Sequence, residues 1–350
     1  MSIILITGSS GLVGSESVNF FSNKGFDVIG IDNDLRKFFF GNEASTNEIK
    51  RELLKKNKKF LNYNTDIRNY NILEKIYKKY KKNISLIIHC AAQPSHDYAK
   101  NYPILDFNIN ATGTLNLLEL TKKYCPEAPF IFMSTNKVYG DNPNKLKIIE
   151  KKNRWELKKT DKFFRGIDEK FSIDNCTHSF FGASKTYADL IVQEYGKNVG
   201  LKTVCFRGGC LTGPNHSGAK LHGFLSYLVK TSLTEKRYSL IGYKGKQVRD
   251  NLHSYDLVNS FWEFFKKPTK GEVYNMGGGR YSNCSIVEAL DLVENITNIK
   301  IKRKIIKAPR VGDHIWYISN LSKFKKHYPK WKQKYNTKKI IEELIDKYRQ

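Results

Sequence analysis

The chain has 350 residues, of which 40% are hydrophobic and 13% aromatic. This length and composition are typical of a globular protein with one large or two smaller domains, and they exclude a disordered chain. The net charge is +26, but the lysines are spread along the chain and no nucleic-acid recognition motif accompanies them. We therefore expect a solvated basic surface and no nucleic-acid partner.

The cysteines and the apolar runs indicate in which cellular compartment the protein is expected. None of the six cysteines forms a Cys-x-x-Cys pair, and four of them lie in apolar or small-residue runs. This pattern predicts reduced, mostly buried thiols and no metal site. The longest apolar runs are too short to span a bilayer, and the first expected strand begins directly after Met1 and Ser2. We expect a cytoplasmic protein with no signal peptide and no membrane association.

The N-terminal half alternates short apolar runs with helical patterns. This alternation is typical of a parallel sheet whose strands are joined by crossover helices. The periodicity predicts strands at residues 3–7, 26–31, 85–90, 129–134 and 202–207. It predicts helices at residues 14–24, 72–81, 104–124 and 183–199.

The remaining segments break this rhythm. Residues 141–179 are polar and have no sustained apolar period, which predicts a functional loop or lid. After Gly208 the elements become shorter and end in an amphipathic helix at 338–348. We predict an α/β fold, a doubly wound Rossmann-type parallel sheet in residues 1–207, with a smaller substrate domain in residues 208–350. A strand near 272–276 is expected to rejoin the large domain.

A glycine-rich turn follows the first strand and opens the first helix. Gly8 permits the tight turn, Gly11 lets the backbone approach a pyrophosphate, and Gly14 allows close packing of helix and strand. The N-terminus of the predicted helix then faces the phosphate charge, and Leu12 and Val13, directly before that helix, are expected to contact the cofactor. The pattern predicts a dinucleotide site.

The end of the second strand indicates which dinucleotide is bound. Asp32, followed by Asn33, places a carboxylate where it can bind a ribose 2′-hydroxyl and would repel a 2′-phosphate. The nearby Arg36 and Lys37 weaken this preference without reversing it. The predicted cofactor is NAD.

Two further pairs of residues are expected beside the cofactor. Asp66 and Ile67 are expected to follow a further strand that lies between those at 26–31 and 85–90, where a carboxylate and an apolar neighbour flank an adenine ring. Ala91 and Ala92 follow the next buried strand, where small side chains let the backbone pass under the cofactor. Close packing explains the two alanines equally well.

Taken in order, these motifs resemble the extended short-chain dehydrogenase/reductase family of nucleotide-sugar epimerases and dehydratases. The resemblance covers about nine-tenths of the chain. It is carried by the glycine motif, Asp32, Asp66, residues 89–92, Asn110 with Gly113 and Thr114, residues 134–140, Lys185, Arg249 with Asp250, and Arg310.

The resemblance implies a catalytic set of Ser/Thr, Tyr and Lys. In the family the Tyr takes the proton of a sugar hydroxyl, the Lys lowers the pKa of the Tyr and binds the nicotinamide ribose, and the Ser/Thr holds the hydroxyl. By position, Thr135 is the Ser/Thr and Lys185 is the Lys. The Tyr is expected four residues before Lys185, where this chain has Phe181.

Because phenylalanine has no proton to exchange, three interpretations are open. The chain is an engineered Tyr-to-Phe variant, a natural branch with another proton acceptor, or a binding protein that has lost catalysis. We favour the natural branch, since a base can be supplied from another wall of a site. Lys185 itself is one candidate, if burial and the oxidised nicotinamide lower its pKa. The others are His96, Asp97, Tyr98, His178, Cys210 and His216.

The second half contains residues suited to a nucleotide sugar. Arg249 offers a planar fork for a diphosphate, and Tyr243 offers an aromatic face for a base. An ordinary hairpin with a surface arginine is the alternative. The resemblance adds Arg310 as a second diphosphate contact and Asn215 as a substrate contact. The other substrate-binding candidates are Gln93, Asn136, Lys137 and Gln247.

Residues 134–141 and 245–250 are most similar to the family's CDP-sugar 2-epimerases, as is the long segment before Lys185. This resemblance implies a CDP-linked sugar that is epimerised at C2 by transient oxidation. Another nucleotide-sugar 4-epimerase, dehydratase or oxidoreductase of the family, or a non-catalytic nucleotide-sugar-binding protein, is the alternative. The helices at 104–124 and 183–199 carry more apolar residues than one sheet face needs, and family members pair these helices, so we expect a homodimer.

Overall fold

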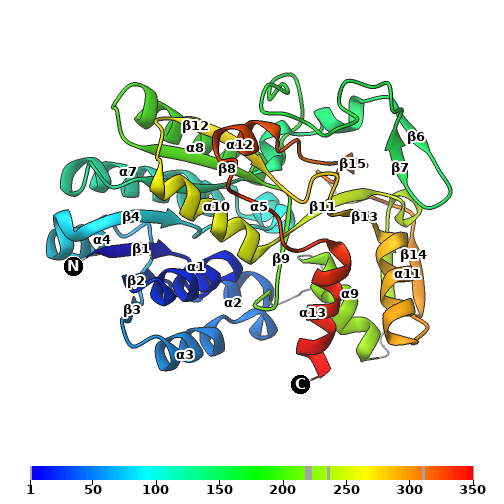
Figure 1. Ribbon diagram of the computed structural model, residues 1–350, viewed down its shortest axis with the longest axis horizontal. Coiled ribbons are helices and arrows are strands. Elements are labelled where there is room, and N and C mark those ends of the chain that lie inside the picture. Colours follow the sequence, from blue (N-terminus) through cyan, green and yellow to red (C-terminus); the bar gives the residue numbers. More distant parts are fainter. Residues whose placement is uncertain (1, 217–222, 235–236, 310–311, 350) are drawn as a thin grey trace. The chain divides into compact units, whose positions relative to one another are not determined.

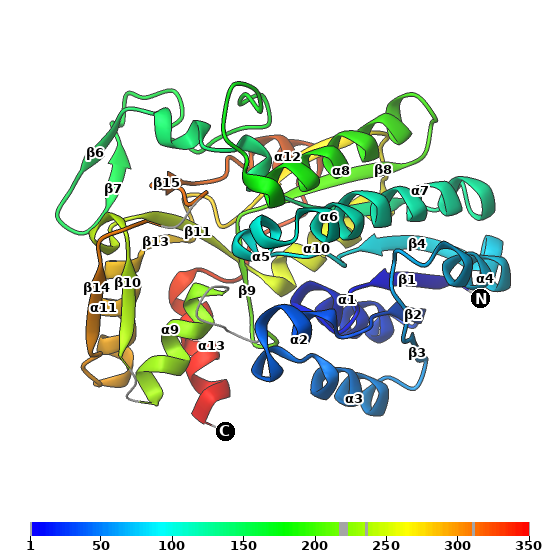
Figure 2. The ribbon, with the colours of Figure 1, turned by 180° about the vertical axis from the view of Figure 1, so that it is seen from behind.

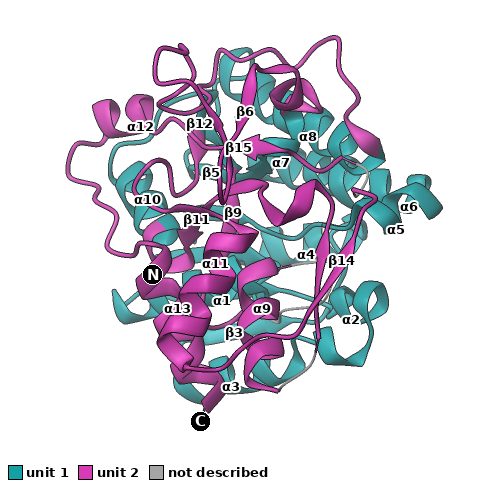
Figure 3. Cartoon of the chain, turned by 90° about the vertical axis from the view of Figure 1, so that its right-hand side faces the viewer, with its two compact units in different colours: residues 1–138, 180–207, 257–274 teal, residues 139–179, 208–256, 275–350 magenta. Residues whose placement is uncertain are grey.

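The computed structural model describes residues 2–216, 223–234, 237–309 and 312–349. The chain forms two compact units that interleave along the sequence (Figure 3). Unit 1 comprises residues 1–138, 180–207 and 257–274, and unit 2 comprises residues 139–179, 208–256 and 275–350. The single domain boundary that we expected at residue 207 therefore differs from the boundary between these two units, because residues 139–179 belong to unit 2.

The reason lies in the composition of residues 139–179. This segment has too few apolar residues to cover a sheet face, and its polar groups find partners within unit 2. Glu156 is buried and pairs with Arg280 at 2.8 Å, and it also accepts a hydrogen bond of 2.9 Å from Nε1 of Trp316. A buried carboxylate needs such partners, so they determine where the segment packs.

Unit 1 is built on a seven-stranded sheet with the order β12-β8-β5-β4-β1-β2-β3. The pairs within β3-β2-β1-β4-β5 are parallel, which is the doubly wound Rossmann-type arrangement that the sequence predicted. The strands are β1 (Ile3–Thr7), β2 (Asp27–Ile31), β3 (Phe60–Tyr63), β4 (Ile84–His89), β5 (Phe130–Thr135), β8 (Thr203–Gly208) and β12 (Glu272–Met276).

Helices cover both faces of this sheet (Figures 1 and 2). Leu73, Leu117 and Val192, from α4, α7 and α8, share one buried cluster with β1 to β5. On the other face, Phe21 of α1 contacts Phe265 of α10. Strands covered on both faces are almost wholly apolar, as in β1, where all five residues are buried. The helices are α1 (Leu12–Asn23), α2 (Leu35–Phe40), α3 (Asn47–Lys56), α4 (Tyr70–Tyr80), α5 (His96–Asn101), α6 (Pro103–Phe107), α7 (Gly113–Tyr124), α8 (Ser179–Lys197) and α10 (Ser254–Lys266).

One predicted helix is divided in the structure. Residues 104–124 form α6 and α7, joined by a stretch of π-helix at Asn108–Thr112. The side chain of Thr114 bonds across this stretch, with its Oγ1 donating to the backbone carbonyl of Asn110 at 2.6 Å. A π-helical turn is rare in general and occurs often at functional sites.

Unit 2 has a small sheet of its own and a separate helical core. Strand β11 (Val248–His253) pairs with β13 (Asn283–Ser285), β15 (Trp316–Tyr317) and β9 (Cys210–Thr212). Two further pairs are β6 (Ile148–Glu150) with β7 (Trp155–Leu157) and β10 (Tyr238–Ile241) with β14 (Arg303–Ile306). The helices are α9 (Phe224–Leu233), α11 (Ile286–Thr297), α12 (Ser322–His327) and α13 (Thr337–Arg349).

Three expectations about what the chain lacks can be compared with the described ranges. No helix there is long and apolar enough to cross a bilayer. No group of three or more His, Cys, Asp and Glu side chains in those ranges has the arrangement of a metal site. All six cysteines are free thiols, and Cys125, Cys205 and Cys284 are buried.

Candidate active site

The three glycines after β1 are each required for a different reason. Gly8 has a φ of +65°, and a Cβ there would lie 2.8 Å from the backbone nitrogen of Ala91. A Cβ on Gly14 would lie 2.0 Å from the carbonyl oxygen of Gly8, which no side chain tolerates. At Gly11 a Cβ would come no closer than 3.4 Å to any protein atom. The protein itself therefore requires Gly8 and Gly14, whereas a Cβ at Gly11 would make only an ordinary contact with the Gly8 carbonyl oxygen.

The position of Gly11 suits a dinucleotide. Gly11 is the N-cap of α1 and supplies no side-chain hydrogen bond to the free backbone N–H groups of the first turn, at Leu12 and Val13. Such a helix start carries a partial positive charge and binds phosphate well. The residues present thus fit the pyrophosphate of NAD, with Gly11 as the point of close approach.

Asp32 follows β2 and is held by the glycine loop. Its carboxylate accepts hydrogen bonds of 2.9 Å from the backbone nitrogens of Ser10 and Asp34. Burial raises the pKa of Asp32, although these two bonds act in the opposite direction. The side chain is half-buried, and Asn33 next to it is exposed. Arg36 lies over the ring of Phe40 at 4.9 Å. The carboxylate is therefore fixed in position at the end of the strand, as a ribose contact requires.

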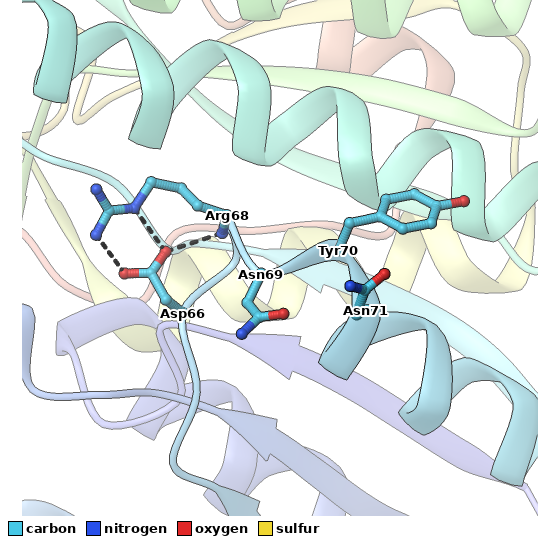
Figure 4. A pocket seen from close by; sticks show the side chains of 5 residues that line it. All are labelled: Asp66, Arg68, Asn69, Tyr70 and Asn71. Carbon is cyan, nitrogen blue, oxygen red and sulfur yellow. Dashed lines mark hydrogen bonds and ion pairs between the residues drawn. The ribbon is translucent and has the colours of Figure 1, made fainter.

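Asp66 has a cationic partner that the sequence analysis missed. Arg68 donates from Nε and Nη2 to the carboxylate of Asp66 at 2.9 and 2.8 Å (Figure 4). Asn33 also donates to this carboxylate, at 2.9 Å. Although burial raises the pKa of Asp66, the bonds from Arg68 and Asn33 lower it below its usual range. Asp66 and Arg68 line an open depression together with Asn69, Tyr70 and Asn71. The Asp-x-Arg spacing was the available signal for this pair.

Ile67 and the two alanines are placed by packing. The side chain of Ile67 is buried, and a Cβ on Gly113 of α7 would lie 2.5 Å from its Cδ1. Ala91 and Ala92 are half-buried after β4, and Ala91 lies against Gly8. Packing against the glycine loop therefore explains Ala91, whereas a role beside the cofactor stays a prediction for Ile67, Ala91 and Ala92.

Lys185 lies under the carboxyl end of β5. Its Nζ donates to the carbonyl of Met133 at 2.7 Å and lies 4.0 Å from the ring centre of Phe132. Burial lowers the pKa of Lys185 to about 8, although Asp189 opposes this shift. Thr135 ends β5 half-buried, and its Oγ1 accepts a hydrogen bond of 3.2 Å from the backbone nitrogen of Lys137. Strand β5 thus carries Thr135 at its carboxyl end, and α8 brings Lys185 to the Met133 carbonyl of the same strand.

Phe181 lies one helical turn before Lys185 on α8, where the family has tyrosine. Its side chain is 7% exposed. The ring of His96 packs against it edge to face, with ring centroids 4.9 Å apart and planes inclined by 71°. Of the base candidates in unit 1, His96 is the one in ring contact with Phe181, whereas Tyr98 stacks on Tyr102 at 4.6 Å.

A buried polar network joins this helix to the segment before α5. Ser184 donates to the carboxylate of Asp106 at 2.6 Å, and Gln93 donates to the same carboxylate at 2.7 Å. Asn110 donates to both Ser184 and Asp106, at 3.1 and 3.0 Å. Burial raises the pKa of Asp106, while the bonds from Ser184 and Gln93 oppose the shift. Sequence reasoning missed Asp106 and Ser184, because polar residues inside helices carry no motif.

The structure gives Gln93 a different environment from the one expected of a substrate contact. The side chain is fully buried, and its amide nitrogen donates to Asp106 and to the carbonyl of Ser95. Its amide oxygen accepts from the backbone nitrogen of Ser95. Because both ends of the amide are engaged, Gln93 positions its neighbours, and we leave it out of the substrate contacts proposed below. Asn136 is also buried.

In unit 2 the expected diphosphate residue already has an anionic partner. Arg249 is 11% exposed, and its Nη2 contacts the carboxylate of Asp313 at 2.5 Å. Burial raises the pKa of Tyr243, and Asp313 adds to this shift while Arg249 opposes it, so the three side chains are grouped. The amide nitrogen of Gln247 donates to Ile241 at 2.9 Å. The contact with Asp313 was not predicted, and it uses one of the guanidinium nitrogens of Arg249 that were expected to bind phosphate.

The other predicted site residues of unit 2 have fewer contacts that bear on a function. Asn215 is half-buried in the turn after β9, beside the buried His216. Cys176 lies 3.6 Å from Nε2 of His178. Arg310, the second expected diphosphate contact, lies outside the described residues.

The fold and the glycine loop define a dinucleotide-binding protein of the Rossmann type. The model of the NAD-dependent epimerase/dehydratase family matches residues 4–277. The chain belongs to this family, and NAD as the predicted cofactor class is thereby confirmed. It is 30% identical to CDP-paratose 2-epimerase of Salmonella typhi over 350 residues, covering 98% of both chains.

Other members are also similar. The chain is 26% identical to dTDP-glucose 4,6-dehydratase of Haemophilus influenzae, covering 93% of this chain and 86% of the relative. The structure of UDP-glucuronic acid 4-epimerase from Bacillus cereus, in complex with UDP-glucuronic acid and NAD, has a TM-score of 0.80 at 22% identity and covers 99% of both chains. The family prediction is confirmed, and the type of enzyme within the family is not decided by these similarities.

Gly11 and Gly14 separate cofactor binding from packing. We expect Gly11→Ala to leave the melting temperature of the cofactor-free protein nearly unchanged and to weaken NAD binding at least tenfold, because the new Cβ fills the phosphate approach. Gly14→Ala should lower both the melting temperature and the affinity for NAD, since its Cβ collides with Gly8. Calorimetric titration with NAD and thermal unfolding measure the two effects. Unchanged NAD affinity in Gly11→Ala would contradict the assignment of the phosphate site.

The buried Lys185 should destabilise the cofactor-free fold below its own pKa. The pKa is about 8 in the folded chain and 10.5 ordinarily, so charging Lys185 costs folding free energy below pH 8. The cost disappears as the pH rises to 10.5. We expect Lys185→Met to raise the melting temperature at pH 7 by a few degrees, with a smaller gain at pH 10. The exposed Lys197→Met, on the same helix, is the control and should show no such pH dependence.

Proposed function

We propose that this protein is an NAD-dependent nucleotide-sugar epimerase that inverts C2 of a CDP-linked deoxyhexose, as CDP-paratose 2-epimerase does. The observation that carries the proposal is the 30% identity to that enzyme over 98% of both chains. Residues 134–141 and 245–250 also support it, because their sequences resemble the forms that these two family motifs take in CDP-sugar 2-epimerases. A 4-epimerase or dehydratase is the second candidate, because members with these activities are similar over almost the same length.

The residues of unit 1 support hydride chemistry at a sugar carbon. NAD, when bound, would accept a hydride from that carbon and return it to the opposite face. Thr135 would hold the sugar hydroxyl, and the ammonium of Lys185 would bind the nicotinamide ribose. Gly11 and the first turn of α1 would bind the pyrophosphate, and Asp32 the adenosine ribose. A non-catalytic binding protein would have no need to keep Thr135 and Lys185.

We assign the nucleotide part of the substrate to unit 2. Arg249 would bind the diphosphate, in exchange for part of its contact with Asp313, and Tyr243 would pack against the base. Gln247 and Asn215 are further contacts of the same unit, and Arg310 is retained on resemblance alone. In unit 1, Asn136 and Lys137 follow Thr135 and are the proposed contacts to the sugar.

The proposed activity is tested with a panel of CDP-, UDP- and dTDP-linked hexoses and deoxyhexoses. We expect inversion at C2 of the CDP-linked deoxyhexose, detected by proton NMR of the product, without net consumption of NAD. Thr135→Val should lower the rate by about 10²-fold or more, as expected for a residue that holds the reacting hydroxyl. Turnover confined to UDP- or dTDP-sugars, or inversion at C4, would contradict the proposed specificity.

We also propose that two copies associate through α6 and α8. The side chains of Ile104, Phe107, Phe180 and Leu190 are 77%, 46%, 55% and 45% exposed, an apolar surface that a monomer would leave in water. Phe107 and Tyr187 contact each other across the two helices at 5.6 Å, which makes the surface continuous. Both helices would pair with the same helices of a second copy.

Light scattering at micromolar concentration should give twice the mass of the chain. The double variant Ile104→Glu/Leu190→Glu should shift the protein to monomer, because it places charges in the interface. Ile305→Glu is the matched control, since Ile305 is 70% exposed but lies on β14 of unit 2. A monomeric wild type, or a double variant that remains a dimer, would overturn this assignment.

A further inference from the structure

The missing tyrosine leaves the proposed reaction without a proton acceptor. In unit 1 the ring in contact with Phe181 is the imidazole of His96, with centroids 4.9 Å apart. We propose that His96, whose ring packs against that of Phe181, is the catalytic acid and base of this enzyme and takes over the role of the missing tyrosine hydroxyl. This inference rests on the proposed redox epimerisation.

His96 is placed where a catalytic group would need to be. It is the first residue of α5, and its side chain is half-buried, so it is neither locked in the core nor free in solvent. An imidazole exchanges protons near neutral pH, which phenylalanine and the amides around it do not. The edge-to-face contact with Phe181 holds one side of the ring, and Phe181 itself is fixed by α8 one turn before Lys185.

The buried polar network holds the start of α5, and with it His96, in position. Gln93 bonds to both the backbone nitrogen and the carbonyl of Ser95, the residue before His96. The same Gln93 shares the carboxylate of Asp106 with Ser184 of α8. Ser95 in turn caps α5 by accepting from the backbone nitrogen of Tyr98. The start of α5 is therefore tied to the helix that carries Phe181 and Lys185, and such a second layer keeps a catalytic group in position.

The two neighbours of His96 on α5 are less suited to the role. Asp97 is exposed. The ring of Tyr98 lies between Phe39 and Tyr102, with centroids 4.6 Å from each. Two other ionisable side chains of this arrangement already have partners: Asp106 on α6 is held by the network, and Lys185 on α8 contacts the Met133 carbonyl. Within the described residues, Cys90, Asp189 and Cys205 also interact electrostatically with Lys185.

The proton transfer balances without a further reactant. The O–H bond of the sugar hydroxyl breaks and its proton moves to a ring nitrogen of His96. The electron pair of that bond forms the carbonyl as the hydrogen of the same carbon leaves as hydride, which reduces NAD⁺. In the second half the ketone takes a hydride on its other face, and the imidazolium returns the proton to the oxygen. His96 is neutral at the start and at the end.

The test compares His96→Ala and His96→Gln with the wild type, using whichever nucleotide sugar the wild type turns over. Both variants should lose about 10²- to 10⁴-fold in turnover while keeping their NAD content and melting temperature. Adding Phe181→Tyr to His96→Ala should restore at least tenfold, because it returns a hydroxyl to the site. The exposed His327→Ala, on α12 of unit 2, is the control and should stay within twofold of wild type.

A second measurement does not depend on turnover. In protein labelled with ¹³C-histidine, the His96 signal is assigned by its absence in His96→Gln. It should titrate between about pH 5 and 8 in the NAD-loaded protein and shift when CDP or a CDP-sugar is added. A His96→Ala variant within threefold of wild-type turnover, or a His96 signal that does not titrate in this range, would overturn the assignment. Absence of any turnover in the wild type would instead count against the proposed function, and the titration then decides the role of His96.

Discussion

The placement of α8, the helix that carries Phe181 and Lys185, depends on a buried ion pair. Asp189 of α8 accepts two bonds from Arg207 of β8, at 2.7 and 3.1 Å, and both side chains are almost fully buried. The same carboxylate accepts from Ser134 of β5 at 2.5 Å. Removing one partner of such a pair typically costs about 3–5 kcal/mol, because the other charge is left without compensation. Asp189 thus joins α8 to two strands, and Lys185, one turn earlier, reaches the Met133 carbonyl of β5 as a consequence.

A second constraint in unit 1 acts at the end of β4. His89 ends β4 and bonds to Thr7 Oγ1 at 2.7 Å and to Thr114 Oγ1 at 2.9 Å. Burial lowers its pKa well below the usual range, and the charge of Lys185 adds to this effect, so the ring is a neutral link between β1, β4 and α7. The glycine loop follows β1, and β5, whose Met133 carbonyl accepts from Lys185, pairs with β4, the neighbour of β1. A cofactor and a reacting carbon would therefore have a rigid support.

Much of unit 1 was predictable from the sequence because its signals are local. Apolar runs mark the buried strands of the parallel sheet, and the spacing of Gly8, Gly11 and Gly14 needs only the turn between β1 and α1. The interleaved units were not predictable, since the place of residues 139–179 depends on the distant partners Arg280 and Trp316 of Glu156. The partners of Arg249 and Gln93 were missed for the same reason. No period or motif links Arg249 with Asp313, or Gln93 with Asp106 and Ser184.

Phe181 is where the sequence departs from the family and where the structure adds most. The sequence indicated that a hydroxyl is missing, but the contact with His96 depends on how α5 packs against α8. The central claim is that the sugar carbon is oxidised by loss of a hydride and reduced again by its return. A side chain accepts the hydroxyl proton and gives it back. The most direct test is turnover of the protiated substrate in D₂O, followed by NMR of the product. We expect the inverted carbon to keep its original hydrogen. Deuterium at that carbon in proportion to turnover would mean that inversion proceeds by proton abstraction, and would contradict the hydride mechanism.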